Sequence, residues 1–208
     1  MRDRPPPEGS APARPGRPRS EASRQAILTA AVELVAEQGY AALSIEGIAA
    51  RSGTGKQTIY RWWPTKADVV LEALATKADL HVPIPDTGSY RDDLRAFLAT
   101  TLAMGAQPRV PEVLRSLMAH AQLDPGFAVR FRSRFLQRRR DALAVVVDRA
   151  AGRGEVPPGL SRETTLDLVF GVIWYRILTT PDTTALVGPG RAQELIDELL
   201  IAVTGGRA

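Results

Sequence analysis

Apolar residues recur at intervals of three and four through successive segments between Ser23 and Val203, and this spacing constrains the fold more than any other feature. It places the apolar side chains along one face of an α-helix. No convincing run of alternating apolar and polar residues bounded by turns is present, which excludes a β-sheet. The sequence therefore predicts an all-α fold.

The first patterned segments predict three helices separated by tight turns. A stripe over residues 27–35 stops at Gly39. A short helix follows Ser44, whose side chain suits an N-cap. A second short helix runs over residues 56–62, and Thr65 would cap a further apolar-striped helix. Two short helices joined by a tight glycine-containing turn form a helix-turn-helix pattern.

Five more helical patterns follow a loop at residues 81–89 that contains prolines and a glycine. The pattern over 161–179 is apolar nearly all round, so it must be covered on all sides, which indicates a partner subunit. Gly171 in this segment permits close approach of another helix. The five patterns lie at about residues 90–102, 113–121, 127–151, 161–179 and 190–203.

The formal net charge of +4 is unevenly distributed. Residues 1–66 carry all of the excess positive charge, and the rest of the chain is balanced. This asymmetry indicates contact with nucleic acid or another acidic surface, or else a solvated basic tail. Residues 1–20 contain six of the sixteen prolines and almost nothing apolar, so we expect a disordered basic arm.

Several classes of protein are excluded by composition. The chain has no cysteine, which excludes a disulfide framework and thiolate zinc ligation. With only two histidines, we expect neither a metal site nor another cofactor. No catalytic motif is present, so an all-α enzyme is the weaker alternative. The chain lacks a membrane-length apolar run and a secretion signal, so we expect a cytoplasmic protein without membrane contact.

The second short helix carries an unusual number of hydrogen-bond donors. Ile59 and Trp63 are spaced to anchor it inward, whereas its other side chains are polar. Arginine and lysine suit guanine edges, glutamine suits adenine, and a threonine or aromatic ring can touch the thymine methyl group. The polar side chains are those of Lys56, Gln57, Thr58, Tyr60 and Arg61.

Residues 23–67 resemble the DNA-binding domain of the tetracycline-repressor (TetR) family. The resemblance is carried above all by residues 45–66: the core Thr58-Ile59-Tyr60, the paired aromatics Trp62-Trp63 and the trailing Thr65-Lys66. It covers roughly a fifth of the chain. The implied division is an arm at 1–20, a helix-turn-helix DNA-binding domain at 21–67, and a helical effector-binding and dimerisation domain at 68–208, entered through a linker helix.

The resemblance also implies roles for individual residues. Side chains of the second short helix would face bases or adjacent phosphates, and three others would hold phosphate oxygens, which positions a protein without reading sequence. Gly55 stands where the family often has a side chain that contacts DNA, so we assign it no contact. The base-facing set is Lys56, Gln57, Thr58 and Arg61, and the phosphate set is Ser44, Tyr60 and Lys66.

The arm offers a second DNA contact. The segment Arg14-Pro15-Gly16-Arg17-Pro18-Arg19 resembles arms whose arginines enter a narrow A·T-rich minor groove. An unstructured basic leader without a partner is the alternative.

A small-molecule pocket in the helices after residue 90 is a further implication of the resemblance. An effector would favour an arrangement in which the protein no longer fits its operator. For each candidate lining residue, a place in the hydrophobic core is the alternative. The candidates are Phe97, Met104, Met118, His120, Arg139 and Trp174.

Arg139 has two interpretations of its own. At 100° per residue, Leu136, Leu143 and Val147 define the apolar face of the long helix, and Arg132 and Arg139 point along it. Such an arginine either pairs with a carboxylate such as Asp167 or binds an anionic effector.

These expectations lead to one functional reading. We expect a DNA-binding transcriptional regulator, a repressor released from its operator by an unidentified small molecule. The segments at 161–179 and 190–203 would form a self-complementary homodimer interface, so the operator would be a near-palindrome with half-sites about 34–36 Å apart, or a multiple of that distance. The alternative is a helical DNA-binding regulator or interaction module without an effector.

Overall fold

The computed structural model describes residues 17–79, 84–180 and 189–205, and all regular structure in these ranges is helical. The all-α prediction is confirmed. No helix in these ranges is long and apolar enough to cross a membrane. The helices are α1 (Arg17–Ala42), α2 (Ile45–Ser52), α3 (Lys56–Trp62), α4 (Lys66–Asp79), α5 (Tyr90–Gly105), α6 (Val110–Leu123), α7 (Pro125–Phe131), the π-helical η1 (Arg132–Leu136), α8 (Gln137–Gly152), α9 (Arg162–Thr179) and α11 (Pro189–Thr204).

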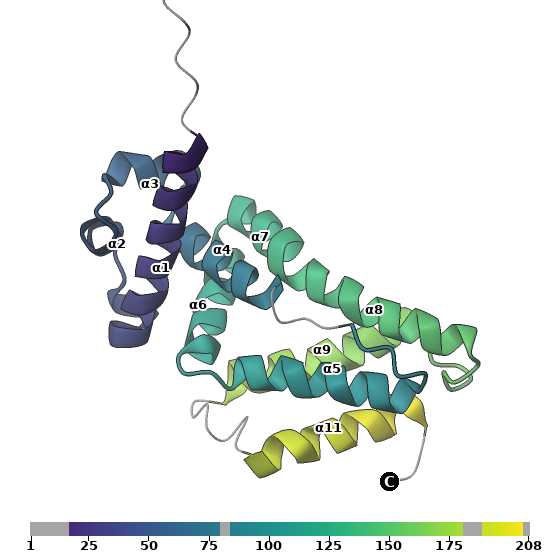
Figure 1. The fold of residues 1–208 in the computed structure, drawn as a ribbon. Coiled ribbons are helices and arrows are strands. Elements are labelled where there is room, and N and C mark those ends of the chain that lie inside the picture. Colours follow the sequence, from purple (N-terminus) through teal and green to yellow (C-terminus); the bar gives the residue numbers. More distant parts are fainter. Residues whose placement is uncertain (1–16, 80–83, 181–188, 206–208) are drawn as a thin grey trace, which may run out of the picture.

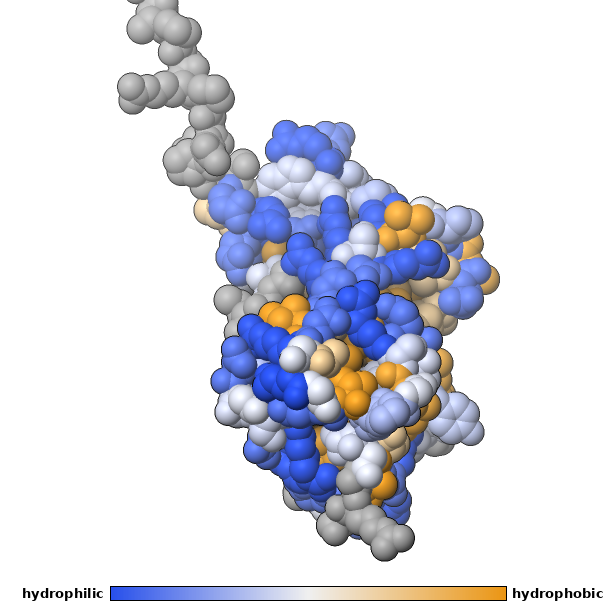
Figure 2. Space-filling model, turned by 90° about the vertical axis from the view of Figure 1, so that its right-hand side faces the viewer, coloured by the Kyte–Doolittle hydropathy of each residue, from blue (hydrophilic) through white to orange (hydrophobic). Residues whose placement is uncertain are grey.

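The helices form a head and a body. The head comprises α1, α2 and α3, and Figure 1 shows it at one end of the molecule. The body comprises α5 to α11, and its helices α5, α9 and α11 are stacked at the other end (Figure 1). Helix α4 lies between the head and the body, and α6 of the body packs against both α1 and α4. The face at the C-terminal end of α8 is mostly hydrophilic and is broken by patches of apolar side chains (Figure 2).

Local sequence signals set most helix ends. The Ser44 hydroxyl oxygen accepts a hydrogen bond from the Gly47 N–H at 3.0 Å, and Gly53 ends α2 in the left-handed conformation at φ 65°. Ser89 and Ser161 cap α5 and α9 in the same way as Ser44 caps α2. These caps satisfy N–H groups that have no partner inside the helix.

The start of α1 differs from the prediction. The helix begins at Arg17, so residues 17–20, which the sequence assigned to a disordered arm, are helical. Pro18 lies in the first turn, where a backbone N–H would have no partner inside the helix, so a proline is tolerated there. The helix can therefore begin before residue 21 despite this proline. The rest of the predicted arm, including Arg14, lies outside the described residues.

The helix predicted over residues 127–151 is interrupted by the π-helical segment η1. Phe127, Phe131, Phe135 and Arg139 follow one another at four-residue intervals and are all buried. At about 100° per residue, each such interval drifts by about 40° around a regular helix. A π turn contains more residues, so it holds the series on one face. Arg132, which was expected on this face, is exposed instead.

The buried apolar residues form two clusters, and their division does not coincide with the predicted boundary at residues 67 and 68. One cluster joins the head to α4, α6 and the phenylalanines of α7 and η1. The other joins α5, α8, α9 and α11. The head therefore shares its core with part of the body.

Candidate nucleic-acid interface

Helix α3 is held by one apolar face and presents a polar one. Ile59 is completely buried and Trp63 is 1% exposed, as their spacing predicted. The opposite face points to solvent, and Tyr60 on it is 52% exposed. Lys56, Gln57 and Arg61 are also exposed, whereas Thr58 is partly buried. The structure thus brings the predicted base-facing side chains onto one short helix.

Helix α2 is attached to α1 by an ion-pair cluster. The Arg51 guanidinium donates to both carboxylate oxygens of Glu37, at 2.9 and 2.8 Å, and to Glu33 at 3.4 Å. The Arg51 hydrogen bond lowers the pKa of Glu37. Because these groups are exposed, the ion pairs add little to the free energy of unfolding. Their main effect is to orient α2, and through it α3.

The cationic side chains of α3 are available to a ligand. The Lys56 ammonium lies 3.1 Å from the Glu46 carboxylate, and both side chains are more than half exposed. Such an exposed pair contributes little to stability, so another anion can readily replace Glu46 as the partner of Lys56. The Arg61 guanidinium lies over the Trp62 ring, 5.7 Å from its centroid. A phosphate oxygen or a guanine edge can therefore reach either cation.

Two of the predicted phosphate-binding residues already have structural partners. The Ser44 oxygen caps α2, although its hydroxyl proton remains available for donation. The Lys66 ammonium donates to the carbonyl oxygens of Tyr40, Ala41 and Leu43 at 3.3, 3.4 and 2.7 Å. An ammonium group has three N–H donors, so in the free protein a phosphate would have to compete with these carbonyls.

The junction between head and body contains acidic residues that sequence reasoning missed. The Glu72 carboxylate on α4 accepts a hydrogen bond from the Trp63 indole at 2.9 Å and pairs with Arg24 and Arg134. Trp63 is the C-cap of α3, and Arg24 and Arg134 come from α1 and η1, so one carboxylate links α3 to the body. The partners lie as far as 62 residues away in sequence, and no local pattern indicates them.

A second link joins α1 directly to α6. The Tyr40 N–H donates to Glu112 Oε1 at 3.1 Å. The preceding Gly39 has φ 81° and ψ 167°, a conformation essentially restricted to glycine. A Cβ atom at Gly39 would lie 2.9 Å from Glu112 Oε1. Gly39, predicted only as a helix stop, therefore also permits the approach of α6.

The six candidate pocket residues are divided among three places. Met104, Arg139 and Trp174 line one cavity of about 190 Å³ in the body. Phe97 is 1% exposed and packs edge-on against Phe170. The remaining two do not line this cavity: Met118 packs against the first core cluster, and the His120 ring meets the Phe127 ring edge-on, with 4.7 Å between ring centroids.

A larger groove of about 520 Å³ lies between the head and the body. Its lining comes from α1, α4, α5 and α6 and includes Val35, Leu74 and Val113. Met104 lines both this groove and the smaller cavity. Helix α6 does so too, with Pro111 in the cavity and Val113 in the groove. Met104 and the first residues of α6 therefore form the wall between the cavity and the groove.

Helix α9 has an apolar stripe that the described part of the chain leaves exposed. Leu168, Tyr175 and Leu178 are 39%, 69% and 47% exposed, and Gly171 lies on the same face. Ile201 on α11 is 44% exposed. The segment at 161–179 is therefore less enclosed within the chain than a core helix would be.

Comparisons with known proteins agree over most of the chain. Residues 27–73 match the family model of bacterial regulatory proteins of the tetR family, and residues 84–199 match the tetracyclin repressor-like C-terminal domain. The uncharacterized HTH-type transcriptional regulator YdeS of Bacillus subtilis is 38% identical over 80% of this chain and 84% of its own length.

Two further proteins show the same relationship. The DNA-binding transcriptional repressor TetR of Mycobacteroides abscessus is 28% identical over 89% of this chain and 95% of its own. The crystal structure of the TetR family transcription regulator SCO0332 superposes with a TM-score of 0.70 at 28% identity, covering 86% of this chain and 96% of that one. Sequence and fold thus point to the same group of proteins.

Proposed function

Because this chain belongs to the TetR family of bacterial transcriptional regulators, we propose that it is a cytoplasmic repressor that binds a near-palindromic operator as a homodimer and leaves it when a small molecule binds the body. The protein is a DNA-binding regulator with a helix-turn-helix head. The polar outer face of α3, held by Ile59 and Trp63, is the observation that carries the proposal.

The proposed DNA contacts divide by chemistry. Lys56, Gln57, Thr58 and Arg61 read bases or hold adjacent phosphates in the major groove, because α3 is short and its exposed groups are donors. Tyr60 and the N-terminus of α2 at Ser44 hold phosphate oxygens. Lys66 joins them only if its hydrogen bonds to the end of α1 are released.

The proposed dimer uses the exposed stripe of α9 together with α11. A self-complementary surface requires each helix to meet its own copy. A Cβ atom at Gly171 would meet no atom of the described residues within 4 Å, so the packing of these residues does not require a glycine there. Close approach of a partner helix supplies a reason for it.

The proposed release begins in the small cavity of the body. A ligand there contacts Met104 and the first turn of α6 at Pro111. The same turn carries Glu112, which holds the Tyr40 N–H at the end of α1. Displacement of α6 would therefore alter the orientation of the head, and with it the spacing of two recognition helices in a dimer.

Selection of bound fragments from the source genome, followed by fluorescence anisotropy on the recovered sites, tests the proposal. We expect near-palindromic sites, an affinity that falls steeply with salt, and a sequence-specific remainder. Gln57→Ala should weaken discrimination at one base pair by about 1–3 kcal/mol, whereas Gln137→Ala, at an exposed residue of α8, should not.

The alternative without an effector makes a different prediction at the same operator. Cell extracts and compound libraries would then leave the affinity unchanged. Absence of any sequence-specific remainder at low or high salt would reject DNA readout by α3, and a monomer in sedimentation at micromolar concentration would reject the dimer.

A further inference from the structure

We propose that the cavity in the body binds a small organic monoanion, a carboxylate on an apolar skeleton, and that the Arg139 guanidinium holds its carboxylate. The regulatory consequence of this binding rests on the proposed function above. The binding itself depends only on the body and is measured without DNA.

Arg139 is a buried cation for which the described residues supply no acidic partner. Only 7% of the surface of Arg139 is exposed. The guanidinium donates to the Thr101 hydroxyl oxygen at 3.1 Å and to the Met104 sulfur at 3.5 Å, and it lies 5.7 Å from the centroid of the Phe135 ring. Among the residues that the structure describes, no carboxylate lies within ion-pair distance of it.

The expected partner is engaged elsewhere. Asp167 pairs with the neighbouring Arg140 at 2.7 Å, so the predicted Arg139–Asp167 pair is not formed. Arg140 and Arg176 also line the cavity, but they pair with Glu163 and Glu198 at 2.9 and 3.0 Å. Of these three arginines, Arg139 alone brings a positive charge that no protein carboxylate balances in the described ranges.

An unbalanced buried cation favours an anionic ligand. Burial lowers the pKa of Arg139 to about 10, which still leaves the group charged at neutral pH. Removal of a charge from water is unfavourable unless an opposite charge and hydrogen bonds compensate it. A carboxylate supplies both, because its two oxygens match the paired N–H groups of a guanidinium.

The rest of the lining defines the remainder of the ligand. Apart from the arginines and Thr101, the cavity is walled by apolar side chains, including Leu102, Leu114 and Trp174. Its volume of about 190 Å³ lies below the range of roughly 300–1,000 Å³ that suits drug-sized ligands. The best fit is therefore a single aromatic ring or a short alkyl chain that carries one carboxylate.

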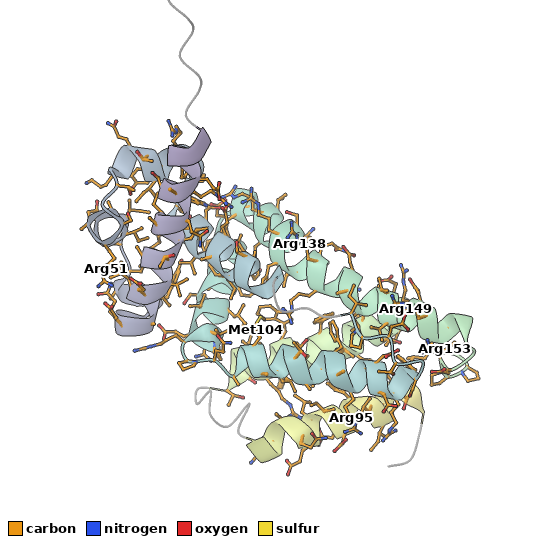
Figure 3. All side chains as sticks on the ribbon, in the orientation of Figure 1. Arg51, Arg95, Met104, Arg138, Arg149 and Arg153 are labelled. Carbon is orange, nitrogen blue, oxygen red and sulfur yellow. The ribbon has the colours of Figure 1, made fainter. Side chains whose placement is uncertain are left out.

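The position of Arg139 also connects the ligand to the head. A carboxylate that takes the guanidinium would compete with its contacts to Thr101 and Met104. Figure 3 shows Met104 at the C-terminal end of α5, beside α6 and near the centre of the molecule. Since Met104 also lines the groove against the head, a change in its packing reaches the surface on which α1 and α4 rest.

Isothermal titration calorimetry of the full chain with two matched pairs tests the inference. The pairs are benzoate with benzamide and hexanoate with hexanamide, since each amide keeps the shape and removes the charge. We expect at least one carboxylate to bind at millimolar concentration or below, about tenfold or more tightly than its amide. Arg139→Met should abolish that preference.

Arg138→Met is the matched control. Arg138 precedes Arg139 on α8, is exposed, and does not line the cavity (Figure 3). This variant removes the same charge from the chain and should keep the wild-type preference. If Arg139→Met does not fold by circular dichroism, Thr101→Val, which removes one contact of the guanidinium, should still change the ratio of carboxylate to amide affinity.

Three results overturn the inference: an amide that binds as tightly as its carboxylate, a preference for carboxylate that survives in Arg139→Met, or no binding of either carboxylate at millimolar concentration. Each can occur while operator binding is intact, and then only the ligand class fails. Conversely, carboxylate binding that depends on Arg139 in a chain that recognises no operator would reject the proposed function and keep the site.

Discussion

Asp68 on α4 joins the linker helix to the body through an ion pair. Our principal prediction is that removal of its charge lowers the stability of the protein. The side chain is 4% exposed. One carboxylate oxygen accepts the Arg130 Nε–H at 2.6 Å, and the other accepts from Arg130 Nη2 at 3.3 Å and from the Thr65 N–H and hydroxyl at 3.1 and 2.8 Å. The residue therefore caps α4 and joins it to α7.

Asp68→Asn keeps the shape and one acceptor oxygen but removes the charge. Breaking a fully buried ion pair costs about 3–5 kcal/mol, whereas an exposed pair contributes about 0–1 kcal/mol. Asp68 is buried but Arg130 is 31% exposed. We therefore expect a loss of about 2–3 kcal/mol, or a melting temperature lower by roughly 4–12 °C for a chain of this size.

Urea unfolding followed by tryptophan fluorescence measures this loss at one fixed protein concentration, because the unfolding of an oligomer depends on concentration. Asp148→Asn, the same change at an exposed carboxylate that pairs with Arg162, should leave the midpoint unchanged. A double-mutant cycle with Arg130→Met isolates the coupling between Asp68 and Arg130. A loss below about 0.5 kcal/mol, or no coupling, would refute the reasoning.

Three further predictions concern the junction, the dimer and the pH dependence of stability. Gly39→Ala should destabilise the chain, because an alanine cannot adopt φ 81° without strain and its Cβ would clash with the Glu112 carboxylate; an unchanged urea midpoint would contradict this. Gly171→Leu should leave the helical circular dichroism signal intact and shift sedimentation toward monomer, and a dimer as tight as wild type would remove α9 from the interface. Burial raises the pKa of Tyr90 to about 12, whereas an unfolded tyrosine titrates near 10, so the unfolded chain loses its proton first and stability should fall as the pH rises from about 10 to about 12. Tyr90→Phe should make that fall shallower in urea titrations, and an identical slope would show that Tyr90 does not cause it.

The helices themselves could be predicted because their signals are local. A serine at an N-cap and an apolar stripe act within one or two turns, so Ser44, predicted as an N-cap, also caps α2 in the structure. The polar face of α3 follows for the same reason, since burial of Ile59 and Trp63 determines which side chains point outward. The irregular π segment was missed because we assumed a regular helical period.

The tertiary structure alone decided how the charged side chains are paired. Residues 139 and 140 are both arginines, and only the packing of α8 against α9 assigns Asp167 to Arg140 and leaves Arg139 to the cavity. Likewise, Lys66 donates to the carbonyls at the end of α1, which only the folded head brings within its reach. Such contacts depend on which helices meet, and helix propensity and periodicity carry no information about distances between residues far apart in the chain.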